Sequence, residues 1–143
     1  MKNSTPDRVL VLTSYPPRVC GIATYTQDLV TALNKTFSGP DRYTVCAMEN
    51  APVDRDYPVE VTHQLNALDP DDHIRLALEV DHDTRIKRVW VQHEFGLYQG
   101  GQGHYLMQFL NAVDKPVAIT FHTVLPAPSP ERLGTIRALA GRA

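Results

Sequence analysis

The sequence predicts an α/β domain in which helices pack on both faces of a doubly wound, mainly parallel β-sheet. Four short runs are rich in apolar and β-branched residues, and three of them are nearly continuous in apolar residues, as in strands covered on both faces. Helical apolar spacing lies between these runs, and such alternation favours right-handed crossovers and parallel strands. At 143 residues the chain fits one domain, residues 1–143, with a core of its own.

The strong predicted strands are residues 8–13 (RVLVLT), 43–48 (YTVCAM), 88–93 (RVWVQH) and 117–122 (VAITFH), with a weaker one at 59–63 (VEVTH). In the usual order of such a fold, the first strand lies beside the fourth, the one that starts at residue 88. Ligands bind at that crevice, outside the carboxyl ends of the strands. The residues that follow these strands are therefore the candidates for a site.

Helices are predicted in four places. Apolar spacing predicts the first over about four turns, and residues 38–40 (SGP) end it. Asp69 before Pro70 is typical of an N-cap that starts the second helix, and Ser129 opens the fourth. The predicted apolar faces are Ile22, Tyr25, Leu29, Leu33 and Phe37; Ile74, Ala77 and Leu78; Leu106, Phe109, Leu110 and Val113; and Leu133, Ile136 and Ala140.

Composition and charge exclude several classes of function. The formal charge of -2 offers no basic field for nucleic acid. Cys20 and Cys46, without a CxxC pair, form neither a disulfide framework nor a cysteine zinc site, so a reduced cytoplasmic protein is expected. No apolar run approaches the roughly 20 residues of a membrane span, and residues 1–7 are too short and polar for a signal peptide. No strongly basic amphipathic helix supports association with a membrane surface.

Five residues at the predicted strand ends are expected to share the crevice: Arg18, Gly21, His93, Glu94 and His122. Gly21 either allows close packing of helix on strand or leaves the helix start open to an anionic or sugar ligand. Arg18 is either a solvated charge or a clamp on a phosphate or carboxylate. His122 either faces the ligand or bonds a neighbouring backbone carbonyl. His93 and Glu94 are adjacent in an extended segment, so only one is expected to face the site.

Other motifs argue against metal, nucleotide and cysteine chemistry. HEFGL is not HExxH, and the chain has neither GxGxxG nor GK[ST], so no metal or cofactor is expected. Cys20 beside a helix start and a histidine leaves a cysteine hydrolase as a minor alternative, although no GxCxG elbow is present. The DPDD segment is a helix start, with a metal site a remote second interpretation. His63, His73, His82 and His104 are assigned to turns or helix surfaces.

Three segments resemble a known family. PPRVCGIATYTQDLVTAL, VWVQHEFG and PVAITFHTVLPAPSP look like the N-terminal domain of retaining, GT-B fold glycosyltransferases of family 4, in family order over about residues 9–130. The resemblance implies a Rossmann-like N-terminal half of a GT-B fold. It also implies transfer of a sugar from a nucleotide-sugar donor to a glycan, lipid or small-molecule acceptor, without a bound metal.

The resemblance also implies roles for individual residues. Gly21 matches the glycine that approaches the donor phosphate and the acceptor, and His122 matches the histidine that reaches the transferred sugar, the expected catalytic residue. His93 and Glu94 match the HE pair of the preceding strand end, and Arg18 lies where an acceptor or phosphate contact is expected. Cys20 stands where many members have glycine.

The second domain of these enzymes binds the nucleotide and carries a Glu-x7-Glu motif. No two of the glutamates here are eight residues apart; they are Glu49, Glu60, Glu79, Glu94 and Glu131. The chain is therefore expected to be an acceptor-side half without the C-terminal donor-binding domain, and to be catalytically silent alone. The alternative is a stand-alone Rossmann-like module that binds a phosphorylated or sugar ligand without catalysis.

Overall fold

The computed structural model describes residues 6–37, 42–51, 54–101 and 103–143, and it shows an α/β domain. Five parallel strands form one sheet in the order β3-β2-β1-β4-β5. The predicted fold class is confirmed, as is the pairing of the first strand with the fourth. The strands are β1 (Arg8–Thr13), β2 (Tyr43–Glu49), β3 (Val61–Asn66), β4 (Ile86–His93) and β5 (Val117–Phe121).

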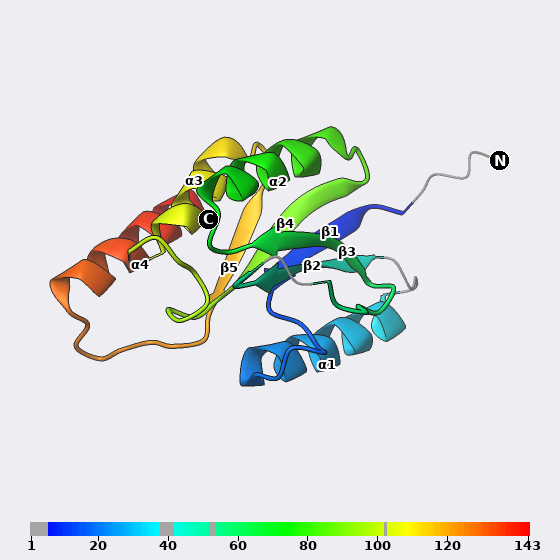
Figure 1. Cartoon of the computed structure of the whole chain (residues 1–143), viewed down its shortest axis with the longest axis horizontal. Helices are drawn as coiled ribbons and strands as arrows, with labels where there is room; N and C mark the ends of the chain where they lie inside the picture. The colour runs from blue at the N-terminus through cyan, green and yellow to red at the C-terminus, as the bar shows by residue number, and fades with distance from the viewer. Residues whose placement is uncertain (1–5, 38–41, 52–53, 102) are drawn as a thin grey trace.

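The helices lie on the two faces of this sheet. α1 lies on one face, whereas α2, α3 and α4 lie on the other (Figure 1). The chain therefore changes its direction of winding between β1 and β4, where the fold places its ligand crevice. The helices are α1 (Gly21–Thr36), α2 (Pro70–His82), α3 (His104–Ala112) and α4 (Pro130–Arg142), and the predicted stop at 38–40 lies outside the described residues.

Two apolar clusters form the core, one on each face. Leu10 and Leu12 of β1 belong to the larger cluster, which α2, α3 and α4 cover, and Val11 belongs to the smaller one beneath α1. Each fully buried leucine contributes about 1.5 to 3 kcal/mol relative to an exposed one. The continuous apolar run of β1 therefore reflects burial on both faces, as the sequence predicts.

The buried face of α1 differs from the predicted stripe. Tyr25 is 46% exposed and Phe37 is 49% exposed, whereas Ala23, Thr26 and Val30 are buried. Thr26 is buried because its hydroxyl group lies 3.0 Å from that of Thr13 in β1, so two polar groups satisfy each other at the contact. The ring of Tyr25 consequently points away from the core.

α2 is rotated in a similar way relative to its predicted face. Ile74 and Leu78 are exposed, while His73 and Leu76 are fully buried. The assignment of His73 to a surface is therefore wrong. Asp69 caps the helix as predicted, because its carboxylate accepts a hydrogen bond of 2.9 Å from the backbone N–H of Asp71.

The remaining elements differ from the prediction in details. α3 buries Leu106, Phe109 and Leu110 as expected. In α4 the fully buried residue is Leu139, whereas Ala140 is exposed. The weak strand predicted at 59–63 lies at Val61–Asn66, because residues 59 and 60 form a turn directly before it.

The register of β5 against β4 determines which side chains reach the crevice. Trp90 pairs with Ala118, Gln92 with Thr120, and the indole N–H of Trp90 donates a hydrogen bond of 2.9 Å to the hydroxyl oxygen of Thr120. Trp90 packs on the α1 side of the sheet. Because side chains alternate along a strand, Gln92 and, past the end of β5, His122 lie on the same side.

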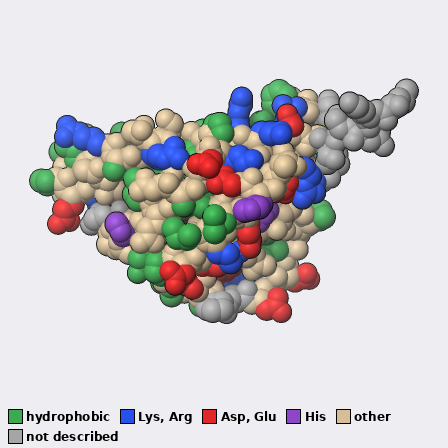
Figure 2. All heavy atoms as spheres, turned by 90° about the horizontal axis from the view of Figure 1, so that it is seen from above, with side chains coloured by type: hydrophobic (Ala, Val, Ile, Leu, Met, Phe, Trp, Pro, Cys, Tyr) green, Lys and Arg blue, Asp and Glu red, His purple; other side chains and the backbone are tan. Residues whose placement is uncertain are grey.

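On the outer face formed by α2, α3 and α4, acidic and basic side chains lie interspersed (Figure 2). This distribution agrees with the small formal charge of -2. Within the described ranges, the structure contains no helix long and apolar enough to cross a membrane.

Candidate functional site

The loop between β1 and α1 begins at the carboxyl end of β1, the edge of the sheet where ligands bind in such folds. It contains a cis peptide bond between Pro16 and Pro17. Cys20 is the N-cap of α1: its sulfur accepts a hydrogen bond of 3.4 Å from the N–H of Ala23 and lies 3.0 Å from the hydroxyl oxygen of Ser14. Because these partners do not include a histidine, the base that a cysteine hydrolase needs, the structure lends that alternative no support.

Gly21 opens α1 and is exposed to solvent. A Cβ atom built on it has no described atom within 4 Å, and its φ is not positive. Gly21 therefore serves neither close packing nor a left-handed backbone conformation. The N–H groups of Gly21 and Ile22 have no intrahelical partners, and the absence of a side chain at Gly21 leaves them open to a ligand, whereas Cys20 already caps the N–H of Ala23.

Arg18 lies away from the other candidates, toward β2. Its Nη1 donates a hydrogen bond of 3.0 Å to the backbone carbonyl oxygen of Met48, near the end of that strand. The side chain is half-buried, so it is not a freely solvated charge. β1 separates it from the ends of β4 and β5.

His122 follows β5 directly and is half-buried. Its Nε2 lies 2.8 Å from Oε1 of Gln92, and its backbone N–H donates to the carbonyl oxygen of His93. The ring of Tyr25 meets the imidazole edge-on at a centroid distance of 4.9 Å. Tyr25 lies one helical turn after Gly21 on the same side of α1, so the ring of His122 lies near the open helix start. No described residue is hydrogen-bonded to its Nδ1.

His93 points to the opposite face of the sheet, as the alternation in a strand requires. It is only 2% exposed and stacks on Tyr98, with Phe95 and Phe121 at its edges. Burial lowers its pKa below the ordinary value, so the ring is neutral at pH 7. The side chain belongs to an aromatic cluster in the core and does not face the crevice.

Glu94 connects the loops that follow β4 and β5. Its Oε1 accepts a hydrogen bond of 2.9 Å from the N–H of Phe95, and its Oε2 accepts one of 2.5 Å from the hydroxyl group of Thr123. Thr123 follows His122 directly, so this carboxylate fixes the loop that carries the histidine.

Around His122 the structure places Glu94, which is bonded to the next residue of the loop, and Gly21, which lies one helical turn before the contacting Tyr25; Arg18 and His93 lie elsewhere. Two further residues of this group, Tyr25 and Gln92, were not among the sequence candidates. Gln92 carried a signal, since it is a polar residue directly after the apolar run 89–91 of a strand predicted to be buried. Tyr25 carried none, because its spacing matched that of a core position.

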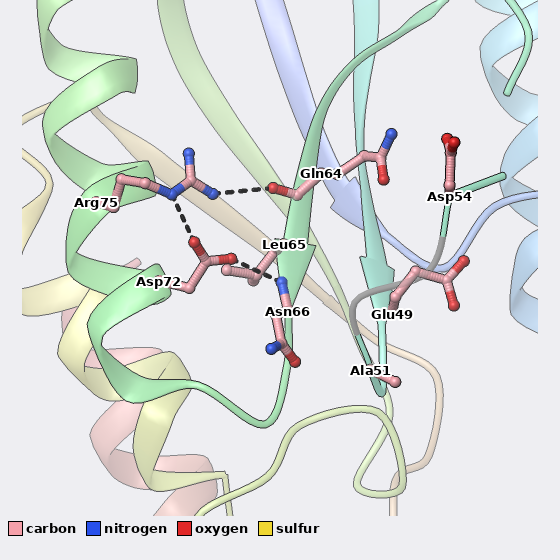
Figure 3. A pocket seen from close by; sticks show the side chains of 8 residues that line it. All are labelled: Glu49, Ala51, Asp54, Gln64, Leu65, Asn66, Asp72 and Arg75. Carbon is pink, nitrogen blue, oxygen red and sulfur yellow. Dashed lines mark hydrogen bonds and ion pairs between the residues drawn. The ribbon is translucent and has the colours of Figure 1, made fainter. Parts of the chain in front are cut away.

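A separate pocket of about 540 Å³ lies at the carboxyl ends of β2 and β3 (Figure 3). Arg75 and Asp72 of α2 pair along one wall at 2.5 Å, and Arg75 also donates to the carbonyl oxygen of Gln64. The lining residues are Glu49, Ala51, Asp54, Gln64, Leu65, Asn66, Asp72 and Arg75.

Some polar side chains of this pocket have hydrogen-bond partners among the described residues, and others do not. Glu49 is buried and accepts hydrogen bonds from Arg55, at 2.6 Å, and from the hydroxyl group of Tyr57. Burial and the contact with Glu49 raise the pKa of Tyr57 above its ordinary value. The side chains of Asp54 and Gln64 have no hydrogen-bond partner among the described residues, so they are available to a ligand.

Within the part of the chain that the structure describes, no three His, Cys, Asp or Glu side chains are grouped so that they could hold a metal ion. No protein-family model, curated protein or solved structure matches this chain.

Proposed function

We propose that this chain is the acceptor-side, N-terminal half of a retaining glycosyltransferase of the GT-B type, similar to family 4. The observation that carries the proposal is the placement of His122 at the carboxyl end of β5, against Gln92 of β4 and Tyr25 of α1. Its ring is held between the buried Gln92 and Tyr25, one turn from the open helix start at Gly21. The three family-like segments of the sequence meet at this point.

Each residue has a role in the proposed reaction. His122 offers Nδ1 to the sugar that is transferred, and Gly21 leaves the start of α1 open to a phosphate or sugar oxygen. An anion at a helix N-terminus gains about 0.3 to 1 kcal/mol, so this contact orients the ligand more than it provides affinity. Glu94 keeps the loop of His122 in place. Catalysis then consists of positioning and of stabilising charge on the departing phosphate.

The pocket beside β2 and β3 favours a second candidate, a module that binds a sugar or another hydroxyl-rich ligand without catalysis. The side chains of Asp54 and Gln64, which have no hydrogen-bond partner among the described residues, offer acceptors and donors suited to hydroxyl groups. Its volume of about 540 Å³ is within the range of small-molecule sites.

NMR titration of the ¹⁵N-labelled chain distinguishes the two. We expect simple methyl glycosides to shift the signals of Gly21, Glu94 and His122, and a nucleoside diphosphate to leave them unchanged, because the nucleotide is read by the other domain of such enzymes. His122→Ala should abolish the glycoside shifts, whereas His82→Ala, at an exposed position of α2, should not.

Other results favour other functions. Glycoside shifts confined to Gln64 and Asn66 indicate the binding module. Nucleoside diphosphate binding in place of glycoside binding contradicts an acceptor-side half. Sugar transfer from a nucleotide sugar by the 143-residue chain alone contradicts the expected division of labour between two domains.

A further inference from the structure

Gln92 in β4 is a fully buried glutamine, and among the described residues only one atom of its amide group is hydrogen-bonded. Its Oε1 lies 2.8 Å from Nε2 of His122, whereas its own Nε2 is buried with no partner among the described residues. An unpaired buried amide N–H costs about 1 to 3 kcal/mol. Such a residue is disfavoured by folding alone, which suggests that its contact with His122 has a function.

The contact determines which imidazole nitrogen carries the proton. An amide oxygen can only accept a hydrogen bond, so Nε2 of His122 is the donor and carries the hydrogen. The neutral ring then has its lone pair on Nδ1. The reverse orientation of the amide would place the proton on Nδ1 and leave a buried oxygen unpaired, so the two orientations predict opposite tautomers.

We propose that Gln92 is a positioning residue of the site: its amide oxygen holds His122 as the Nε2–H tautomer and leaves Nδ1 to accept a hydrogen bond from a ligand hydroxyl group. The second half of this statement rests on the proposed function. The first half concerns the chain without any ligand and stands independently of it.

An amide suits this position better than a carboxylate. Its oxygen accepts a hydrogen bond from the neutral ring and from the protonated ring alike, so His122 can gain or lose a proton at Nδ1 without breaking the contact. The nearby carboxylate, Glu94, is bound to Phe95 and Thr123 instead. Among the described residues, Tyr25 of α1 contacts the ring, and His93, whose side chain lies on the opposite face of the sheet, is neutral at pH 7.

The test is the two-bond ¹H–¹⁵N spectrum of the His122 ring in the ¹⁵N-labelled full chain. In the unsubstituted protein we expect a protonated Nε2 and an unprotonated Nδ1. Gln92→Met keeps the length of the side chain but removes the acceptor, so both tautomers should then be populated. Since this variant also removes a buried unpaired donor, it should fold, and circular dichroism checks that it does.

Gln92→Glu provides a second readout. A carboxylate in contact with the ring favours the imidazolium form, so the proton affinity of His122 should rise about tenfold or more. Gln64→Glu is the matched control, because it makes the same change in charge at an exposed position of β3. It should leave the titration of His122 unchanged.

A neutral His122 protonated on Nδ1 in the unsubstituted chain overturns the proposal, whether or not the variants fold. An unchanged tautomer in Gln92→Met overturns it too. The expected tautomer, combined with an Nδ1 signal that methyl glycosides do not move, supports the role of Gln92 in the ring's protonation and contradicts the proposed function. The two failures are therefore distinguishable.

Discussion

Substitution of Gly21 by alanine should stabilise the fold and weaken ligand binding at the same time. The added methyl group meets no described atom within 4 Å, and the backbone conformation suits any residue. A helical glycine costs about 0.5 to 1 kcal/mol relative to alanine, so the free energy of unfolding should rise by up to that amount. For a domain of about this length the Tm should increase by roughly 1 to 4 °C.

Binding should change in the opposite direction. The methyl group occupies the space before the first N–H groups of α1, and loss of a hydrogen bond from one of them to a sugar oxygen removes about 0.5 to 1.5 kcal/mol. This is a decrease in affinity of about two- to tenfold. Thermal unfolding followed by circular dichroism measures the first effect, and NMR titration with methyl glycosides measures the second.

Gly134→Ala is the matched control, because Gly134 also lies in a helix, α4, with no described atom near its added Cβ. It should raise the Tm while leaving glycoside binding unchanged. A lower Tm for Gly21→Ala refutes the claim that the space is open. A higher Tm with unchanged binding refutes the claim that a ligand approaches Gly21.

Two more predictions concern stability. Burial lowers the pKa of His73 and His93, so the unfolded chain binds protons first as the pH falls. The contribution of the two neutral rings to the free energy of unfolding is therefore present above about pH 6.5 and decreases as the pH falls below that value. The urea midpoint should be lower at about pH 5.5 than at about pH 7.5. His93→Phe, which fits the aromatic cluster, should reduce this difference. An equal decrease of the midpoint in the variant contradicts the idea that protonation of His93 causes it. Gly100→Ala should cost about 1 to 3 kcal/mol or more, because φ is +81° and the new Cβ lies 2.5 Å from the ring of Tyr105. Gly101→Ala, with φ of +56° but open space, should lower the Tm less, and an equal decrease contradicts the steric part of the argument.

Much of the fold could be predicted from the sequence, because strands covered on both faces have a distinct composition. β1 and β4 were identified by their apolar runs, and α2 by the Asp69 cap. The buried faces of the helices were harder to predict. Apolar spacing alone does not show that Thr26 can be buried against the hydroxyl group of Thr13, or that His73 can be buried with one ring nitrogen bonded to the carbonyl oxygen of Asp69.

The candidate site could be predicted only in part, for a related reason. Position at a strand end located His122 and Glu94, since the topology brings those ends to one edge. It could not show that Arg18 turns toward Met48, because a long flexible side chain chooses among several nearby carbonyl groups. Nor could it reveal Gln92, whose importance depends on a contact across two strands.

The hydrogen bond between Trp90 and Thr120 stabilises the observed register of β5 against β4. A slip of β5 by one residue would turn His122 to the face of the aromatic cluster and bring Phe121 into the crevice, because successive side chains alternate between faces. The position of His122 thus depends on the alignment of the two strands at Trp90 and Thr120, which lies two residues before Gln92 and His122. Trp90 is the only tryptophan of the chain, so its fluorescence gives a direct optical signal of whether that alignment is intact.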